Sequence, residues 1–328
     1  MTGHRMAAVD AQFYWMSAKI PNDEFLLYAF DGEPADYPAA ADQLRRRADA
    51  EPALSIRVRD RGRTGCPRPS PPEQVVRHEL AEHSWDGCLA AVAGLADDQL
   101  DLRRMAWRLH VFGPVHGIPG VRGPGTVRPA VRPLVRHRAQ LPGPTATVAV
   151  LGAVAQALSD LAGDQADSLG AEVPMAKPGA PQAYNHFGNV VVDLHPRLGA
   201  QARAERIAAG LAAGRRRFEH PATRAADRAF AAVPAALLRW GVDQFDADQR
   251  PDQVAGNTVV SSVNRGPADL SFGGARVVLT AGYPALSPVM GLTHGVHGIG
   301  DTIAISVHAA ASAVPDVDAY LALLDAAL

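Results

Sequence analysis

The stretch "NTVVSSVNRGPADLSFGGARVVLTAGYPALSP", residues 257–288, decides the fold class of this sequence. It contains two runs rich in β-branched residues, 257–263 and 275–283, and a third run of the same kind follows at 301–310. Branched side chains pack well on a pleated, half-buried surface, so each run predicts a β-strand. The C-terminal part of the chain is therefore expected to be built around a sheet.

Helical patterns alternate with these strands. Residues 200–220 predict a long helix and 315–328 a closing helix with Asp316 at its N-cap. Residues 145–163 predict an amphipathic helix whose apolar stripe is Val148, Leu151, Ala155, Leu158 and Leu161. Since strands and helices alternate, we predict a mixed α/β (α+β) protein. The strands near Val191, Val260, Val277 and Ile305 are expected to share one compact lobe.

The first part of the chain predicts a strand at 24–32, a helix at 35–50, a helix at 90–105 and a strand at 106–112. Residues 113–133 are rich in Gly and Pro, and no regular element is expected to hold them. We therefore divide the chain into an N-terminal lobe (1–112), an irregular link (113–133), a helix and crossover (134–184), and a C-terminal lobe (185–328).

Composition excludes several functional classes. The chain has 328 residues and a formal net charge of -2, which does not favour nucleic-acid binding. Its two cysteines, Cys66 and Cys88, make neither a disulfide framework nor a metal cluster, and we expect two free thiols. The N-terminal residues have no apolar signal core and no apolar run is long enough to span a bilayer, so we expect a cytoplasmic protein.

Several separated segments, in order, resemble the bacterial wax ester synthase/diacylglycerol O-acyltransferase (WS/DGAT) family. They are "AAVDAQFYW…EFLLYAFDG", "SWDGCLAAVAGLADDQLDLRRMAWRLHVF", "GAEVPMAKPGAPQAYNHFGNVVVDLHP" and the stretch 257–288. The resemblance implies two chloramphenicol-acetyltransferase-like lobes with a tunnel between them. It also implies acyl-CoA as co-substrate, no bound cofactor, and a long-chain alcohol or diacylglycerol as acceptor. The expected products are wax esters or triacylglycerol.

The family's signature H-H-x-x-x-D-G supplies its general base through the second His, because imidazole accepts a proton near neutral pH. Laid on this pattern, "HRAQLPG" puts His137 at the first His, Arg138 at the base and Pro142 at the Asp. Arginine cannot accept a proton, and proline cannot replace a carboxylate. The better interpretation is a gap. The signature region is missing, the N-terminal lobe is incomplete, and the following segment resembles a later family motif, with Thr147 and Val148 where the family has Asn-Asp.

Two other histidine motifs are alternatives. "HSWDG", residues 83–87, is one residue short of the signature, and a helix start explains it better. "HGVHGIGD", residues 294–301, places His297 and Asp301 at the H-x-x-x-D spacing, although a Gly-rich hairpin loop is the simpler interpretation. If the chain is active, our candidate base is His297, held by Asp301, ahead of His137. His294 and His297 lack an evident third ligand, so we expect no metal site, and His116 is expected in a solvent-facing loop.

The resemblance also marks a substrate-channel segment. Ser262 stands where the family has Asn, Asn264 lies in the altered turn, and Gly266 and Pro267 match. Arg215, Arg216 and Arg217 are expected to be solvated residues at a helix end rather than ligands of CoA phosphates.

Three hypotheses follow. The chain is an acyltransferase that is weak or inactive, a non-catalytic lipid- or partner-binding pseudoenzyme, or a truncated product without independent function. Peripheral contact with a membrane or lipid inclusion, and self-association through exposed strand edges, are further expectations.

Overall fold

The fold was analysed in a computed structural model, which describes residues 5–59, 74–96, 98–116, 130–163, 168–247, 249 and 254–328. The helices of this part of the chain are α1 (Ala8–Met16), α2 (Tyr37–Ala50), η1 (Pro52–Ser55), α3 (Trp85–Leu95), η2 (Arg138–Gln140), α4 (Ala146–Ala162), α5 (Ala200–Glu219), α6 (Pro221–Ala231), α7 (Ala235–Gln244) and α8 (Val317–Ala326). The strands are β1 (Phe25–Asp31), β2 (Val75–His78), β3 (Leu109–Phe112), β4 (Ala130–His137), β5 (Gly170–Ala176), β6 (Phe187–Asp193), β7 (Thr258–Asn264), β8 (Ser271–Phe272), β9 (Ala275–Tyr283), β10 (Leu292–Ile299) and β11 (Thr302–Ala309). The predicted mixed α/β class is confirmed.

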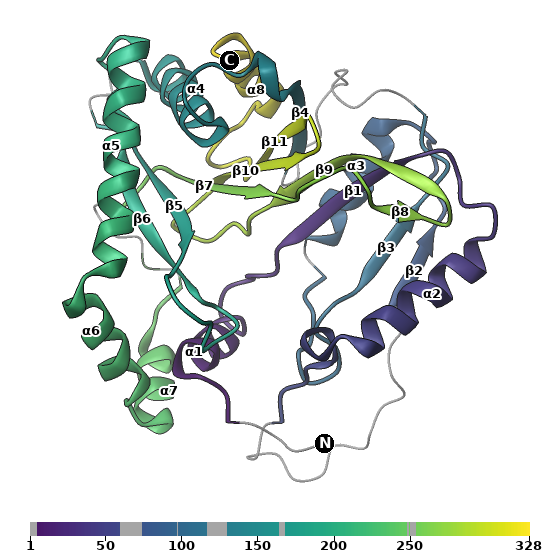
Figure 1. Cartoon of the computed structure of the whole chain (residues 1–328), viewed down its shortest axis with the longest axis horizontal. Coiled ribbons are helices and arrows are strands. Elements are labelled where there is room, and N and C mark those ends of the chain that lie inside the picture. The colour runs from purple at the N-terminus through teal and green to yellow at the C-terminus, as the bar shows by residue number, and fades with distance from the viewer. Residues whose placement is uncertain are drawn as a thin grey trace.

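The largest sheet has six strands in the order β4-β11-β10-β7-β5-β6. The hairpin pairs β10–β11 and β5–β6 are antiparallel, whereas β7 runs parallel to both β10 and β5. Helices α4, α5 and α8 lie together on one face of this sheet (Figure 1). Pro133 is tolerated in β4 because β4 is an edge strand, where a missing N–H breaks no inner ladder.

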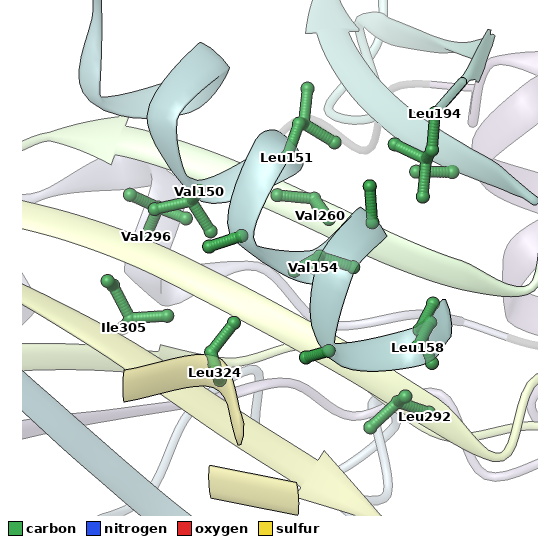
Figure 2. Close-up of a cluster of buried hydrophobic side chains, with 14 of the residues drawn as sticks. Val150, Leu151, Val154, Leu158, Leu194, Val260, Leu292, Val296, Ile305 and Leu324 are labelled. Carbon is green, nitrogen blue, oxygen red and sulfur yellow. The ribbon is translucent and has the colours of Figure 1, made fainter. Parts of the chain in front are cut away.

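Helix α4 forms the centre of the main core, shown in Figure 2. Four residues of the predicted stripe are buried, but Leu161 is 44% exposed. Val150 and Val154, outside the stripe, are fully buried because α5 and α8 flank α4 and cover its sides as well. The helix is thus embedded in the lobe rather than lying on its surface.

A second, three-stranded sheet has the order β1-β9-β8. Strand β9 carries Val277, so the expectation that this strand shares a sheet with Val191, Val260 and Ile305 is wrong. β9 pairs antiparallel with β1 over Phe25–Asp31 and crosses from one lobe to the other, packing on β10 and β11 (Figure 1). A small parallel pair, β2-β3, completes the N-terminal side among the described residues.

The predicted boundaries need three corrections. Strand β4 begins at Ala130, inside the range 113–133 that was expected to be irregular. Strand β5, from the range 134–184, pairs with β6 and β7 and so belongs to the same sheet as the C-terminal lobe. Helix α3 occupies Trp85–Leu95 rather than 90–105, because Ser84 caps it earlier. Residues 117–129 of the link, and Cys66, lie outside the described residues.

Helix α1 is fixed to the C-terminal half by one buried carboxylate. Asp10 accepts hydrogen bonds from the backbone N–H groups of Tyr184 and Asn185, at 3.0 and 2.9 Å, and from Asn185 Nδ2 at 2.9 Å. A buried carboxylate needs such donors to offset its lost hydration. No helix among the described residues has the length and apolar character needed to cross a membrane.

Candidate functional site

The two sheets meet where the end of β9 lies over β10 and β11. Gly282 is the contact point, because a Cβ there would stand 2.2 Å from His297 Nε2. Ser306 Oγ contacts the carbonyl oxygens of Gly282 and Gly295, the latter at 3.2 Å. The absence of side chains at the two glycines lets the backbones approach, and we call this region the inter-lobe junction.

His297 is the buried imidazole of this junction. Only 3% of the residue is exposed, and its Nδ1 makes no hydrogen bond to any described residue. Burial, with a smaller contribution from the positive charge of Arg265, lowers the pKa of His297 to about 4. The ring is therefore neutral at neutral pH and carries a lone pair, as a proton acceptor must.

Asp301 does not hold His297, contrary to our expectation. It lies in the exposed turn between β10 and β11, and its carbonyl oxygen accepts a bond from the backbone N–H of Arg138 at 2.7 Å. The expected loop at 294–301 is also wrong, because residues 292–299 are the fully buried strand β10. His297 lies in the extended strand and Asp301 in the turn beyond its end, so the H-x-x-x-D spacing does not bring these side chains together.

His294 faces the opposite side of the sheet from His297, since neighbouring positions of a strand alternate. Its Nδ1 lies 2.9 Å from Thr258 Oγ1 and its Nε2 lies 2.9 Å from the hydroxyl of Tyr320. Complete burial lowers the pKa of His294 to about 4. His294 is a satisfied core histidine between the sheet and α8.

His137 has a structural role at the surface. Its Nδ1 accepts the backbone N–H of Ala139 at 3.2 Å, and its own N–H donates to Gln140 Oε1 at 2.9 Å. This capping box begins η2. The side chain is exposed, and its Nδ1 is occupied by this cap.

The predicted substrate-channel residues lie in β7 and in the turn that follows it, and Ser262 is on the face of the sheet away from His297. Ser262 pairs in register with Val296 and is bonded to Thr147 Oγ1 at 2.9 Å, on the α4 side of the sheet. Asn264 Oδ1 accepts the N–H of Gly266 at 3.1 Å, and Gly266 has φ +84, which favours glycine. Pro267 is exposed beside this turn. Asn264, Gly266 and Pro267 therefore lie at the end of β7 and in the turn after it, whereas Ser262 is separated from His297 by the sheet itself.

The remaining motifs have structural explanations. Ser84 caps α3 by accepting the N–H of Gly87 at 3.0 Å, so residues 83–87 are a helix start. His116 bonds through its backbone to His83 and Trp85, which joins the two segments. Arg215, Arg216 and Arg217 are exposed at the end of α5. Within the described ranges no group of three His, Cys, Asp or Glu side chains is arranged to hold a metal ion.

Sequence reasoning missed Arg265, Ser306 and His308 as neighbours of the junction. His308 is buried, with Nδ1 3.0 Å from the carbonyl oxygen of Pro284 and its ring 5.8 Å from that of Phe25. Ser306 and His308 alternate in the apolar run "TIAISVHA", and that alternation was the available signal for a polar face on β11.

The two packed sheets, joined by a strand that crosses between them, define the fold of the two-lobed CoA-dependent acyltransferases. A structure of the wax ester synthase/diacylglycerol acyltransferase from Marinobacter aquaeolei VT8 aligns with TM-score 0.66 and 14% identity over 98% of each chain. Mutants of the starter condensation domain of rhizomide synthetase RzmA, solved in complex with C8-CoA, align with TM-scores of 0.56 and 0.54 at 14% identity. Those two alignments cover 99% and 95% of this chain and 93% and 90% of the compared chains.

Residues 184–328 match the family model of the WS/DGAT C-terminal domain, in agreement with the resemblance noted in the sequence. No curated protein matches the chain significantly. The family match begins at Tyr184, where Asp10 anchors α1, so the N-terminal helix is docked directly onto the recognised domain.

Proposed function

We propose that this protein binds an acyl-CoA and a long-chain alcohol or diacylglycerol at the inter-lobe junction, with weak or absent acyl transfer. The observation that carries the proposal is His297, a neutral imidazole between the lobes of a WS/DGAT-type chain, whose Nδ1 is bonded to no carboxylate of the described residues. The C8-CoA bound by the condensation-domain mutants supports acyl-CoA as the ligand class.

In the transfer reaction, an alcohol oxygen attacks the thioester carbonyl, a base takes the alcohol proton, and the CoA thiolate leaves and is protonated. His297 is our candidate for the base. Two features of the structure weaken it. A pKa of about 4 makes the ring a poor base, and its burial means that the junction must open before a hydroxyl reaches it.

The sequence contains no pair of adjacent histidines, so the signature base is absent in any register. Loss of a general base typically costs about 10²–10⁴-fold in rate. Binding without efficient turnover is the expected result, and a non-catalytic lipid- or partner-binding role is the alternative favoured by the unpartnered Nδ1 of His297.

The test combines two measurements on the full chain. Titration calorimetry with an acyl-CoA is expected to show binding, and thiol release with acyl-CoA and hexadecanol or diacylglycerol is expected to be at least about a hundredfold below that of a relative with the intact signature. His297→Gln is expected to remove residual release, whereas His137→Gln, at the exposed cap, is the matched control and is expected to leave it unchanged.

Absence of acyl-CoA binding would overturn the proposal. Efficient release that survives both substitutions would place the active site elsewhere in the molecule.

A further inference from the structure

One end of the molecule exposes large apolar side chains that lie outside the inter-lobe junction. Helices α1, α6 and α7 meet there, beside the end of the β5–β6 hairpin (Figure 1). Tyr184 is 71% exposed, Trp240 60% and Leu237 54%. Phe13 and Phe187, also exposed, contact each other with ring centroids 6.0 Å apart. We call these five residues the apolar end.

Helix α7 is held so that its outer side faces solvent. Leu238 and Val242, four residues apart, are covered on the side that packs against α1. Lys19 Nζ donates to the carbonyl oxygens of Asp243 and Phe245, at 2.7 and 2.6 Å, and so fixes the C-terminal end of the helix. Leu237 and Trp240, three apart, therefore project together from the other side.

The surrounding charge is positive. Between residues 215 and 247 the chain carries six arginines, all exposed, and four acidic residues. The arginines are Arg215, Arg216, Arg217, Arg224, Arg228 and Arg239, and the acidic residues are Glu219, Asp227, Asp243 and Asp246. Asp227 is already paired with Lys177 at 2.8 Å. Asp243 lies 3.9 Å from Arg239 and offsets part of that charge. The net excess of arginine beside exposed Trp and Leu is typical of a surface that inserts at the headgroup level of a lipid layer.

We propose that the apolar end docks the protein on an anionic lipid surface, with Trp240 and Leu237 inserted and the arginines against the headgroups. The inference goes beyond the proposed function, since it concerns a different region from the inter-lobe junction. A protein partner would also cover apolar side chains, but the arginine excess favours an anionic surface over a neutral apolar one.

The experiment is flotation of the full chain with vesicles of phosphatidylglycerol and phosphatidylcholine, in parallel with pure phosphatidylcholine. Binding is expected to anionic vesicles, to weaken as salt is raised, and to fall by at least about tenfold in the Leu237→Ser/Trp240→Ser double variant. Leu161→Ser, on the exposed end of α4, is the matched control and is expected to bind like the unchanged chain. Vesicles of brominated lipid are expected to quench the tryptophan fluorescence of the unchanged chain. The quenched component is expected to be missing in the Trp240→Phe variant.

Failure to bind anionic vesicles, equal binding by the double variant, or concentration-dependent dimerisation that Leu237→Ser/Trp240→Ser abolishes would each overturn the proposal. Acyl-CoA binding in vesicle-free solution is expected to be the same in both variants. Loss of lipid docking is thereby distinguished from failure of the proposed function, which concerns the junction alone.

Discussion

His294 and His297 show how backbone conformation decides the role of two identical side chains. In a helix or a loop, residues three apart can share one side, and that arrangement made them candidate partners. In the extended strand β10 they face opposite sides, so His294 lies in the core of the C-terminal lobe and His297 lies at the inter-lobe junction. The sequence identified His297 as the candidate base. The expected contact with Asp301 required residues 294–301 to form a loop, whereas residues 292–299 form strand β10.

The buried histidines predict a pH dependence of stability. Burial lowers the pKa of His294 to about 4, and the pKa values of His297 and His308 are lowered for the same reason. The unfolded chain, with ordinary histidine pKa values near 6.5, binds more protons between these limits. Stability contributed by the neutral rings is therefore fully present above about pH 6.5 and is lost as the pH falls toward 4.

Urea unfolding at pH 8, 6 and 5 checks this dependence. Because the pKa of His294 falls from 6.5 to about 4, its contribution is expected to drop by roughly 2 kcal/mol between pH 8 and pH 5. In His294→Gln the slope of unfolding free energy against pH is expected to be smaller, and in His137→Gln, at an exposed cap, it is expected to be unchanged. Equal slopes in all three chains would contradict the assignment.

At the scale of elements, hydrophobic periodicity predicted whether a segment is a helix or a strand better than it predicted what packs around that segment. Helices α2, α4, α5 and α8 and strands β1, β6, β7, β9 and β11 occupy nearly the expected residues. Leu161 was misplaced because it lies in the last turn of α4, where residues 160–163 are exposed and no neighbouring element of the described chain covers the stripe. β10 was missed because its two glycines suggested a loop, although Gly295 serves close backbone packing beneath Gly282 of β9.

Helix α5 offers a matched pair of glycines that tests its packing on β6. A Cβ at Gly214 would lie 2.3 Å from Val190 Cγ1, whereas a Cβ at Gly210 would lie 3.4 Å from Val192 Cγ1. Both Gly→Ala changes gain up to about 1 kcal/mol of helix propensity. Gly214→Ala is expected to destabilise the protein by about 1–3 kcal/mol through overpacking, while Gly210→Ala is expected to be neutral or stabilising.

Chemical denaturation of the two variants measures the difference in unfolding free energy. A stabilising Gly214→Ala substitution would show that α5 lies farther from β6 than the structure has it.

At the scale of the whole molecule, the family resemblance gave the two-lobed architecture, but local patterns did not give the pairing of strands. β9 follows β7 and β8 in the sequence and has the same composition as the strands of the six-stranded sheet. Its principal partner is β1, from the other end of the chain, and no local signal encodes such a contact. The junction residues escaped prediction for the same reason, because they come together only through this crossing.

The crossing makes Gly282 a sensitive position. A Cβ there would stand 2.2 Å from His297 Nε2, inside a buried contact that cannot move aside cheaply. Gly282→Ala is expected to destabilise the protein by about 1–3 kcal/mol and to weaken acyl-CoA binding at the junction. Gly94→Ala in α3, where a Cβ would meet nothing within 4 Å, is the control.

Thermal unfolding and calorimetric titration with acyl-CoA are the measurements. Unchanged stability in Gly282→Ala would indicate that β9 does not press on β10. Unchanged acyl-CoA binding despite lower stability would place the ligand away from the junction.

The pairing of Phe25 in β1 with Tyr283 in β9 also limits the order in which the protein can fold. During synthesis β1 leaves the ribosome early. Its backbone N–H and C=O groups have no partner strand until β9, near the end of the chain, has been translated. Such long-range closure is slow, and a waiting strand is exposed to association with other nascent chains. A chain halted before residue 275 lacks the strand that β1 requires. We therefore expect neither half to mature alone, and chaperone occupancy to concentrate on the first strand.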